Sequence, residues 1–266
     1  MSKNANIDGI GSITSGEYDS VSIGGIGKIK GKVSCNKLVT DGMLKGKGKI
    51  SAVNFECNGI SRMFRDIKCK AVTINGILKL RRANLESDLI NCDGIIVCNR
   101  EISSDEIHID GICSVAKMYG DKIIIRNRAN GIAESKIPYK ILPFIRAYLG
   151  RKVSLSHSIV DILECTELNA ENLIAKSVKA HNITLGENCI IDRLDCTGEL
   201  KYHNSCRFRR ISCKNINPSS ENLNIEIQNT DIISDNISVT KTIDLYKKGI
   251  LTANEADQMI KSITKK

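Results

Sequence analysis

The sequence predicts an all-β fold, a parallel β-helix or solenoid in which each turn of the coil, here called a rung, takes about 17 residues. Three observations lead to this prediction. Pairs of small residues ending in glycine recur at an almost constant step, alternating apolar and polar runs precede them, and the 266 residues contain only three prolines. Alternation is typical of strands, and the scarcity of proline leaves long hydrogen-bonded ladders uninterrupted.

The recurring pairs mark the corners of the predicted coil. The steps from each of their glycines to the next are 16, 17, 17, 17, 18 and 17. We interpret the pairs as positions of positive φ, which glycine adopts without a Cβ penalty and which Asp and Asn tolerate. Separate hairpins also use Asn-Gly, but they have no reason to keep one period, whereas a coil does. The pairs are Asp8-Gly9, Gly24-Gly25, Asp41-Gly42, Asn58-Gly59, Asn75-Gly76, Asp93-Gly94 and Asp110-Gly111.

The runs before the corners predict the core. Aromatic residues make up only 4% of the chain, so the core is expected to consist of stacked branched aliphatic side chains. At about 3.3 Å per residue, a rung of about 17 residues has a perimeter of roughly 56 Å, enough for three short sides. One inward column is expected to contain the following residues or their near neighbours: Ile23, Leu38, Phe55, Val72, Ile90 and Ile107.

A second repeated tract follows a break in the pattern. Residues 185–196 match residues 202–213 at an offset of 17, so their cysteines should stack in pairs, Cys189 on Cys206 and Cys196 on Cys213. Whether the two tracts form one rod stays open at this point. The predicted parts are a first solenoid tract (7–135), a helical or irregular insertion (136–152), a second solenoid tract (153–213), a linker (214–241) and a C-terminal helical segment (242–266).

The insertion has its own pattern. Apolar residues recur with i, i+4 spacing between basic residues, although Pro143 would kink a helix. One interpretation is a surface-seeking helix that contacts a membrane or a partner, and the other is a short helical cap packed on the solenoid. The residues of the contact hypothesis are Ile137, Ile141, Ile145, Leu149, Lys140 and Arg146.

The last stretch changes to helical spacing. Gly249 fits a helix C-cap, and Thr252 with Glu255 forms a capping box. A helical hairpin is therefore expected at the C-terminus.

The residues that commonly carry chemistry form no recognisable site. The eleven cysteines are odd in number and lack CxxC spacing, which favours buried, reduced thiols over disulfides or zinc ligands. The four histidines pair with no nucleophile or carboxylate in a catalytic arrangement. The glycine-lysine run from Gly42 to Lys49 is not a phosphate-binding loop. We expect no enzyme activity, cofactor or metal.

Charge and hydropathy limit the cellular location and the partners that we expect for the protein. The formal charge of +9 comes from Lys and Arg spread thinly along the sequence, so no specific nucleic-acid partner is expected. The first residues lack an apolar signal region, and no stretch reaches the roughly 18 apolar residues of a membrane-spanning helix. A cytoplasmic protein is expected.

The whole periodic pattern resembles that of the bactofilins, the bacterial polymer-forming cytoskeletal proteins. The resemblance is carried by the stretch Ile13–Ile23, by the glycine-rich residues 25–31 that follow, and by rungs closed with Asp-Gly or Asn-Gly. It covers residues 7–213 and is strongest with the longer type of Bacillus and Clostridium. The stretch Leu245–Glu255 resembles SHOCT, a short helical C-terminal module of many bacterial proteins.

The resemblance implies a right-handed parallel β-helix that assembles end to end into nucleotide-independent filaments. It also implies a scaffold in the cytoplasm, with peripheral contact at the inner face of the membrane. The expected partner is therefore the protein itself, through the solenoid ends.

Two other functions stay open. A capped solenoid could act as an adaptor that binds a membrane or a polyanion through its basic residues. A hexapeptide-type acyltransferase is also a β-solenoid, but its rungs carry a six-residue repeat, whereas the first tract shows only the longer unit described above.

Overall fold

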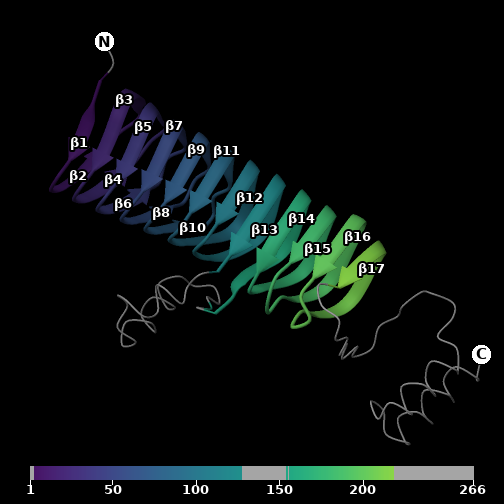
Figure 1. Ribbon diagram of the computed structural model, residues 1–266. Helices are drawn as coiled ribbons and strands as arrows, with labels where there is room; N and C mark the ends of the chain where they lie inside the picture. The colour runs from purple at the N-terminus through teal and green to yellow at the C-terminus, as the bar shows by residue number, and fades with distance from the viewer. Residues whose placement is uncertain (1–2, 128–153, 155, 219–266) are drawn as a thin grey trace, which may run out of the picture. The chain divides into compact units, whose positions relative to one another are not determined.

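A computed structural model describes residues 3–127, 154 and 156–218, and these residues form a parallel β-solenoid (Figure 1). All recorded strand pairings are parallel, so the predicted fold class is confirmed. In the first tract, long strands and short strands alternate along the chain and stack in separate rows (Figure 1). The long row contains β1 (Ala5–Ile7), β3 (Gly16–Ile23), β5 (Val33–Thr40), β7 (Ile50–Cys57), β9 (Ile67–Ile74) and β11 (Leu85–Cys92). The short row contains β2 (Ile10–Ile13), β4 (Ile26–Ile29), β6 (Met43–Gly46), β8 (Ile60–Met63) and β10 (Ile77–Leu80).

From β12 onward, a short segment and the following long segment fuse into one bent strand. The first residues of β12 pair with β10, and its last residues pair with β11. The fused strands are β12 (Ile95–Ile109), β13 (Ile112–Arg126), β14 (Ser158–Glu171), β15 (Leu173–Leu185), β16 (Ile190–Tyr202) and β17 (Arg207–Pro218). Strand β17 thus continues past residue 213, where the second tract was expected to end.

Each rung of the first tract has three sides. In β7, buried and exposed residues alternate except at Val53 and Asn54, where two consecutive exposed residues turn the strand around a corner. The two halves of a long strand therefore form the first and second sides, and the short strand forms the third. This geometry agrees with the perimeter calculated from the period of the glycines.

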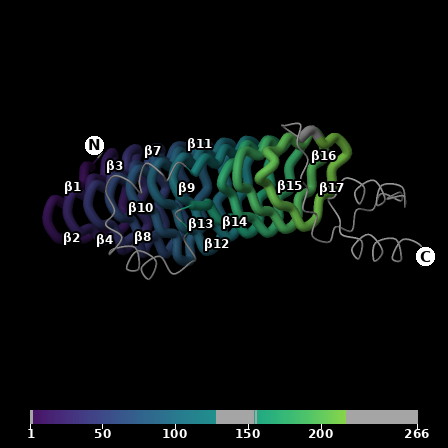
Figure 2. The backbone as a smooth tube through the Cα atoms, turned by 60° about the horizontal axis from the view of Figure 1, so that its bottom comes forward, coloured from purple at the N-terminus to yellow at the C-terminus, as the bar shows by residue number. Residues whose placement is uncertain are grey.

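The two tracts form one continuous stack, which settles the question that the sequence left open. Strand β13 pairs directly with β14, with Ser114 opposite Ile159 and Arg126 opposite Glu171. The chain between them raises the offset between register partners to a constant 45, compared with 15 between β14 and β15. The backbone tube shows the described rungs of both tracts following one another in a single coil (Figure 2).

The core consists of inward columns of aliphatic side chains, as predicted. One column is fully buried and contains Val21, Leu38, Phe55, Val72, Ile90, Ile107 and Ile123. Five of the six predicted members lie in it, whereas Ile23 stacks on Thr40 in the neighbouring column and Val21 takes its place. Burial of such a side chain stabilises the fold by about 1.5–3 kcal/mol.

The glycines do lie at the corners, but our explanation for them was wrong. Positive φ occurs only at Asn172 and Asn188 among the described non-glycine residues, and none of the corner glycines has a φ in the left-handed region. Glycine is needed because the rungs approach closely: a Cβ on Gly59 would lie 2.1 Å from the carbonyl oxygen of Gly42. The corners at Gly25, Gly42, Gly76, Gly94 and Gly111 show the same clash.

Candidate functional site

The backbone of each corner makes a repeated hydrogen-bond pattern with the rung before it. The amides of Asn58 and Gly59 both donate to the carbonyl oxygen of Thr40, each at 2.8 Å. The next corner repeats the pattern, because Asn75 and Gly76 both donate to Cys57. A corner is thus a pair of adjacent N–H groups that converge on one carbonyl of the preceding rung.

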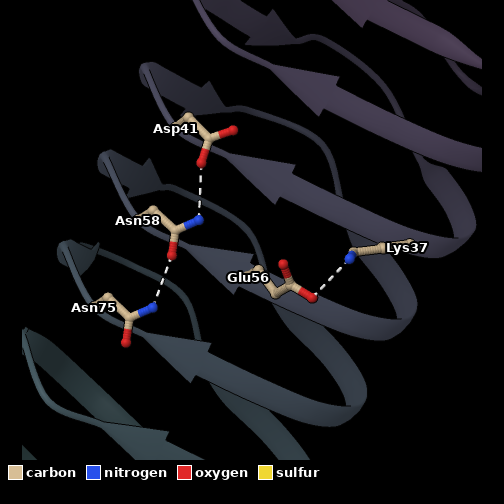
Figure 3. A network of polar contacts seen from close by, with 5 residues as sticks. All are labelled: Lys37, Asp41, Glu56, Asn58 and Asn75. Carbon is tan, nitrogen blue, oxygen red and sulfur yellow. Dashed lines mark hydrogen bonds and ion pairs between the residues drawn. The ribbon is translucent and has the colours of Figure 1, made fainter.

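The side chains of three corners form a polar ladder on the surface (Figure 3). The Asn58 Nδ2 donates to Asp41 Oδ1 at 2.8 Å, and the Asn75 Nδ2 donates to Asn58 Oδ1 at 2.8 Å. Beside the ladder, Lys37 forms an ion pair with Glu56 at 2.9 Å. The ladder ties neighbouring rungs together, so the Asp and Asn of these corners have a structural role.

Among the described residues, the first rung has a neighbouring rung on one side only. Strands β1 and β2 pair with β3 and β4 on one side, and no earlier rung lies among the described residues. At this end, Asp8 and Gly9 form a corner, and the described residues include no earlier rung whose carbonyl could accept its two amides. A Cβ on Gly9 would meet nothing within 4 Å. The core reaches the same end through Ile7 and Ile13, which are 9% and 5% exposed.

Some apolar side chains of the last described rung are only partly covered. Its strand β17 pairs with β16, and Phe208 packs edge-on against Tyr202 with the ring centroids 5.4 Å apart. Phe208 and Ile211 are only partly buried, and Ile216 is 44% exposed.

All eleven cysteines are free thiols, and eight of them are buried, in agreement with the prediction. Burial raises the pKa of Cys35 to about 11 and that of Cys69 to about 12. The predicted stacking is confirmed for Cys196, which lies opposite Cys213 in the strand register.

Cys189 and Cys206 also stack as predicted, and their contact shifts the pKa values of the two thiols in opposite directions. The thiol of Cys189 hydrogen-bonds to the sulfur of Cys206, which lowers the pKa of Cys206, although burial opposes the shift. The same hydrogen bond, together with burial, raises the pKa of Cys189. Cys206 is half-buried, so reagents can reach it.

The histidines lie apart from one another on half-buried or exposed positions. His181 contacts the Thr197 hydroxyl at 3.0 Å, and His203 contacts the Ser205 hydroxyl at 2.9 Å. His108 lies 3.3 Å from a carboxylate oxygen of Glu106. In the described part of the chain, no three His, Cys, Asp or Glu side chains gather closely enough to hold a metal ion.

The structure brings the predicted corner glycines into one column. It does not test the predicted site of membrane or partner contact in the insertion. Ile137, Ile141, Ile145, Leu149, Lys140 and Arg146 lie outside the described residues, as do the predicted C-terminal helices. Residues 3–127, 154 and 156–218 include no helix of the length and hydropathy that membrane crossing needs.

One surface was not predicted from the sequence, a row of cations on the third side of the coil. Lys28, Lys45, Arg62 and Lys79 are opposite one another in successive short strands, although Lys79 is buried. They look scattered along the chain, but they follow one another at the period of the coil. Applying the glycine period to the lysines and arginines would have found them.

Comparisons with protein-family models, curated proteins and solved structures find no match to this chain. The resemblance to the bactofilins therefore stays a prediction.

Proposed function

We propose that the protein is a non-enzymatic, bactofilin-like structural protein that self-assembles through its solenoid ends. The polymers form without nucleotide and act as a cytoplasmic scaffold. One observation supports this proposal above the others, namely the unfinished corner at Asp8 and Gly9. Every later corner of the first tract directs two amides at a carbonyl of the rung before it, and the first corner has the same N–H pair at the open end.

The strands of that end favour addition of another chain. An exposed strand edge is a template for further pairing, and parallel strands pair best where both faces are covered. A further rung would cover the remaining exposed surface of Ile7 and Ile13, which are 9% and 5% exposed, so it adds a small apolar contribution to the backbone hydrogen bonds. A second copy of this chain supplies such a rung.

The test is electron microscopy of the purified full-length chain over a concentration series without nucleotide. Two variants in β1 are compared, Ile7→Lys and Asn6→Lys. Both add one positive charge, but Ile7 lies at the end of the core whereas Asn6 is exposed on the outer surface. Circular dichroism checks that both variants keep the β fold.

We expect filaments with the natural sequence and with Asn6→Lys, and small particles with Ile7→Lys. Uniformly small particles of the natural protein at all concentrations would contradict the proposal. Filaments that persist with Ile7→Lys would show that the N-terminal core is not an assembly surface.

A further inference from the structure

We propose that the third side of the first tract binds the surface of an anionic lipid bilayer. We call this surface the basic side. It consists of β4, β6, β8 and β10 with the residues that follow each strand, and it comprises residues 26–32, 43–49, 60–66 and 77–84. The inference does not depend on the assembly proposed above.

The coil separates charge between its sides. The basic side carries eleven lysines and arginines, of which Lys79 is buried, and a single carboxylate, that of Asp66. The long strands β3, β5, β7, β9 and β11 carry three lysines and five carboxylates on the other two sides. The positive charge of the first tract is therefore concentrated on one side, although it is thinly spread in the sequence.

The cations of this side stack directly on one another. Lys28, Lys45 and Arg62 are register partners in adjacent strands, which in a sheet lie about 4.8 Å apart. The Lys45 Nζ lies over the Phe64 ring, 5.8 Å from its centroid. Like charges placed opposite each other nevertheless repel one another in a sheet. An external surface of negative charge removes the repulsion.

An exposed aliphatic column runs beside the cations. Ile10, Ile26 and Met43 are register partners, and their side chains are 87%, 49% and 47% exposed. Residues two apart in a strand point to the same side, so Ile26 and Lys28 share one outer surface, as do Met43 and Lys45. The column continues through Ile60 and Ile77, which are half-buried.

The combination of the two columns fits a bilayer better than a nucleic acid. Anionic lipid headgroups attract surface cations, and aliphatic side chains gain by entering the interface. A nucleic acid would use the cations, but its bases are bound by stacking aromatic groups, and Phe64 is the single aromatic residue of the basic side. The aliphatic column would have no role there.

The experiment measures partition of the full-length chain onto vesicles by cosedimentation. The vesicles contain phosphatidylcholine alone or with about one-third phosphatidylglycerol. The basic-side variant combines Lys28→Gln, Lys45→Gln and Lys47→Gln. The matched control combines Lys37→Gln, Lys68→Gln and Lys70→Gln on the long strands, where Lys37 and Lys68 already pair with Glu56 and Glu86. Each variant lowers the formal charge by three, from +9 to +6.

We expect binding to the anionic vesicles only. One lysine near such a surface contributes about fivefold to the partition coefficient, so the basic-side variant should lose roughly 100-fold. The control should lose less than about threefold, because its lysines face away from the bilayer. A third variant, Ile26→Ser with Met43→Ser, keeps all charges and should lose roughly fivefold to tenfold through the missing aliphatic contact.

Three results would overturn the proposal. Equal losses in the two glutamine variants would mean that overall charge alone drives binding. Equally tight binding to duplex DNA, with no effect of Ile26→Ser and Met43→Ser, would assign the basic side to nucleic acid. Unchanged binding of the basic-side variant, with loss in Ile141→Asp, would assign lipid contact to residues 136–152. Electron microscopy of each variant reports assembly separately, so the two proposals fail independently.

Discussion

Single residues of the corners control how closely two rungs approach. Gly59 faces the carbonyl oxygens of Gly42 and Asp41, which a Cβ would meet at 2.1 and 2.4 Å. Both contacts are with backbone, so a substitution must push the rungs apart and lengthen the hydrogen bonds between them. Gly9 has an equivalent place in the first rung, but a Cβ there would meet nothing within 4 Å.

We therefore predict that the same substitution destabilises the protein strongly at one of these corners and only slightly at the other. Gly59→Ala should lower the free energy of unfolding by about 3 kcal/mol or more. Gly9→Ala should change it by less than about 1 kcal/mol. Urea denaturation followed by circular dichroism measures both variants. Equal destabilisation would show that backbone conformation, and not close approach, selects glycine at the corners.

Hydrogen bonds also set the reactivity of one thiol. The pKa of Cys206 is lowered mainly by the hydrogen bond from the Cys189 thiol and further by backbone hydrogen bonds of Cys189 and His203, so its thiolate forms at a lower pH than an ordinary cysteine thiolate. Burial raises the pKa of Cys69 to about 12, which keeps Cys69 protonated and unreactive in the folded state.

Cys206 should consequently be the first thiol modified by iodoacetamide at a mildly alkaline pH, and Cys69 should react only after unfolding. The modified residues are identified by mass spectrometry of peptides. Cys189→Ala removes the hydrogen-bond donor and should shift the rate profile of Cys206 to higher pH. Cys98→Ala, at a distant buried cysteine, serves as the control and should leave that profile in place.

At the scale of elements, side-chain ladders reinforce the backbone pairing between rungs. Asn58 is the middle member of its ladder, where it donates one hydrogen bond to Asp41 and accepts one from Asn75 (Figure 3). We predict that Asn58→Ala lowers the free energy of unfolding by about 1–2 kcal/mol, because each net hydrogen bond contributes about 0.5–1.5 kcal/mol. Asn54→Ala, on the exposed surface of β7, should cost less than about 0.5 kcal/mol. Thermal unfolding of the two variants measures the difference.

The elements also show what the sequence could and could not predict. The constant step of the glycines predicted the fold and the corners, because every rung must return to the same position. The place of Val21 was missed because Leu38 follows Ile23 by only 15 residues, whereas register partners in β3 and β5 are 17 residues apart, which places Val21 opposite Leu38. The direct pairing of β13 with β14 was not predictable, since the offset of 45 between their register partners hides the period. The basic side was missed because the period was not applied to charged residues.

At the scale of the whole molecule, the solenoid is a linear stack in which each rung contacts mainly its neighbours. Its stability is then close to a sum of rung contributions and interfaces between rungs. For folding, the number of rungs is less important than the register between them, because a shift by one residue in a strand turns its inward side chains outward. Apart from the step between β13 and β14, register partners in the first and second tracts are offset by 15 to 18, and these offsets mark the range that the coil tolerates.

We therefore predict that a deletion of one full period destabilises the solenoid less than a deletion of half a period. Removing residues 26–42 takes out one full period and joins Gly25 to Met43, so each remaining rung keeps its corner, its three sides and its inward columns. Removing residues 26–34 takes out only about half a period and leaves a turn too short to close around the core. The longer deletion should unfold cooperatively within about 10 °C of the natural Tm, whereas the shorter one should lose the cooperative transition. If the longer deletion unfolded non-cooperatively, the rungs could not be interchangeable units, and the core would depend on contacts that reach beyond neighbouring rungs.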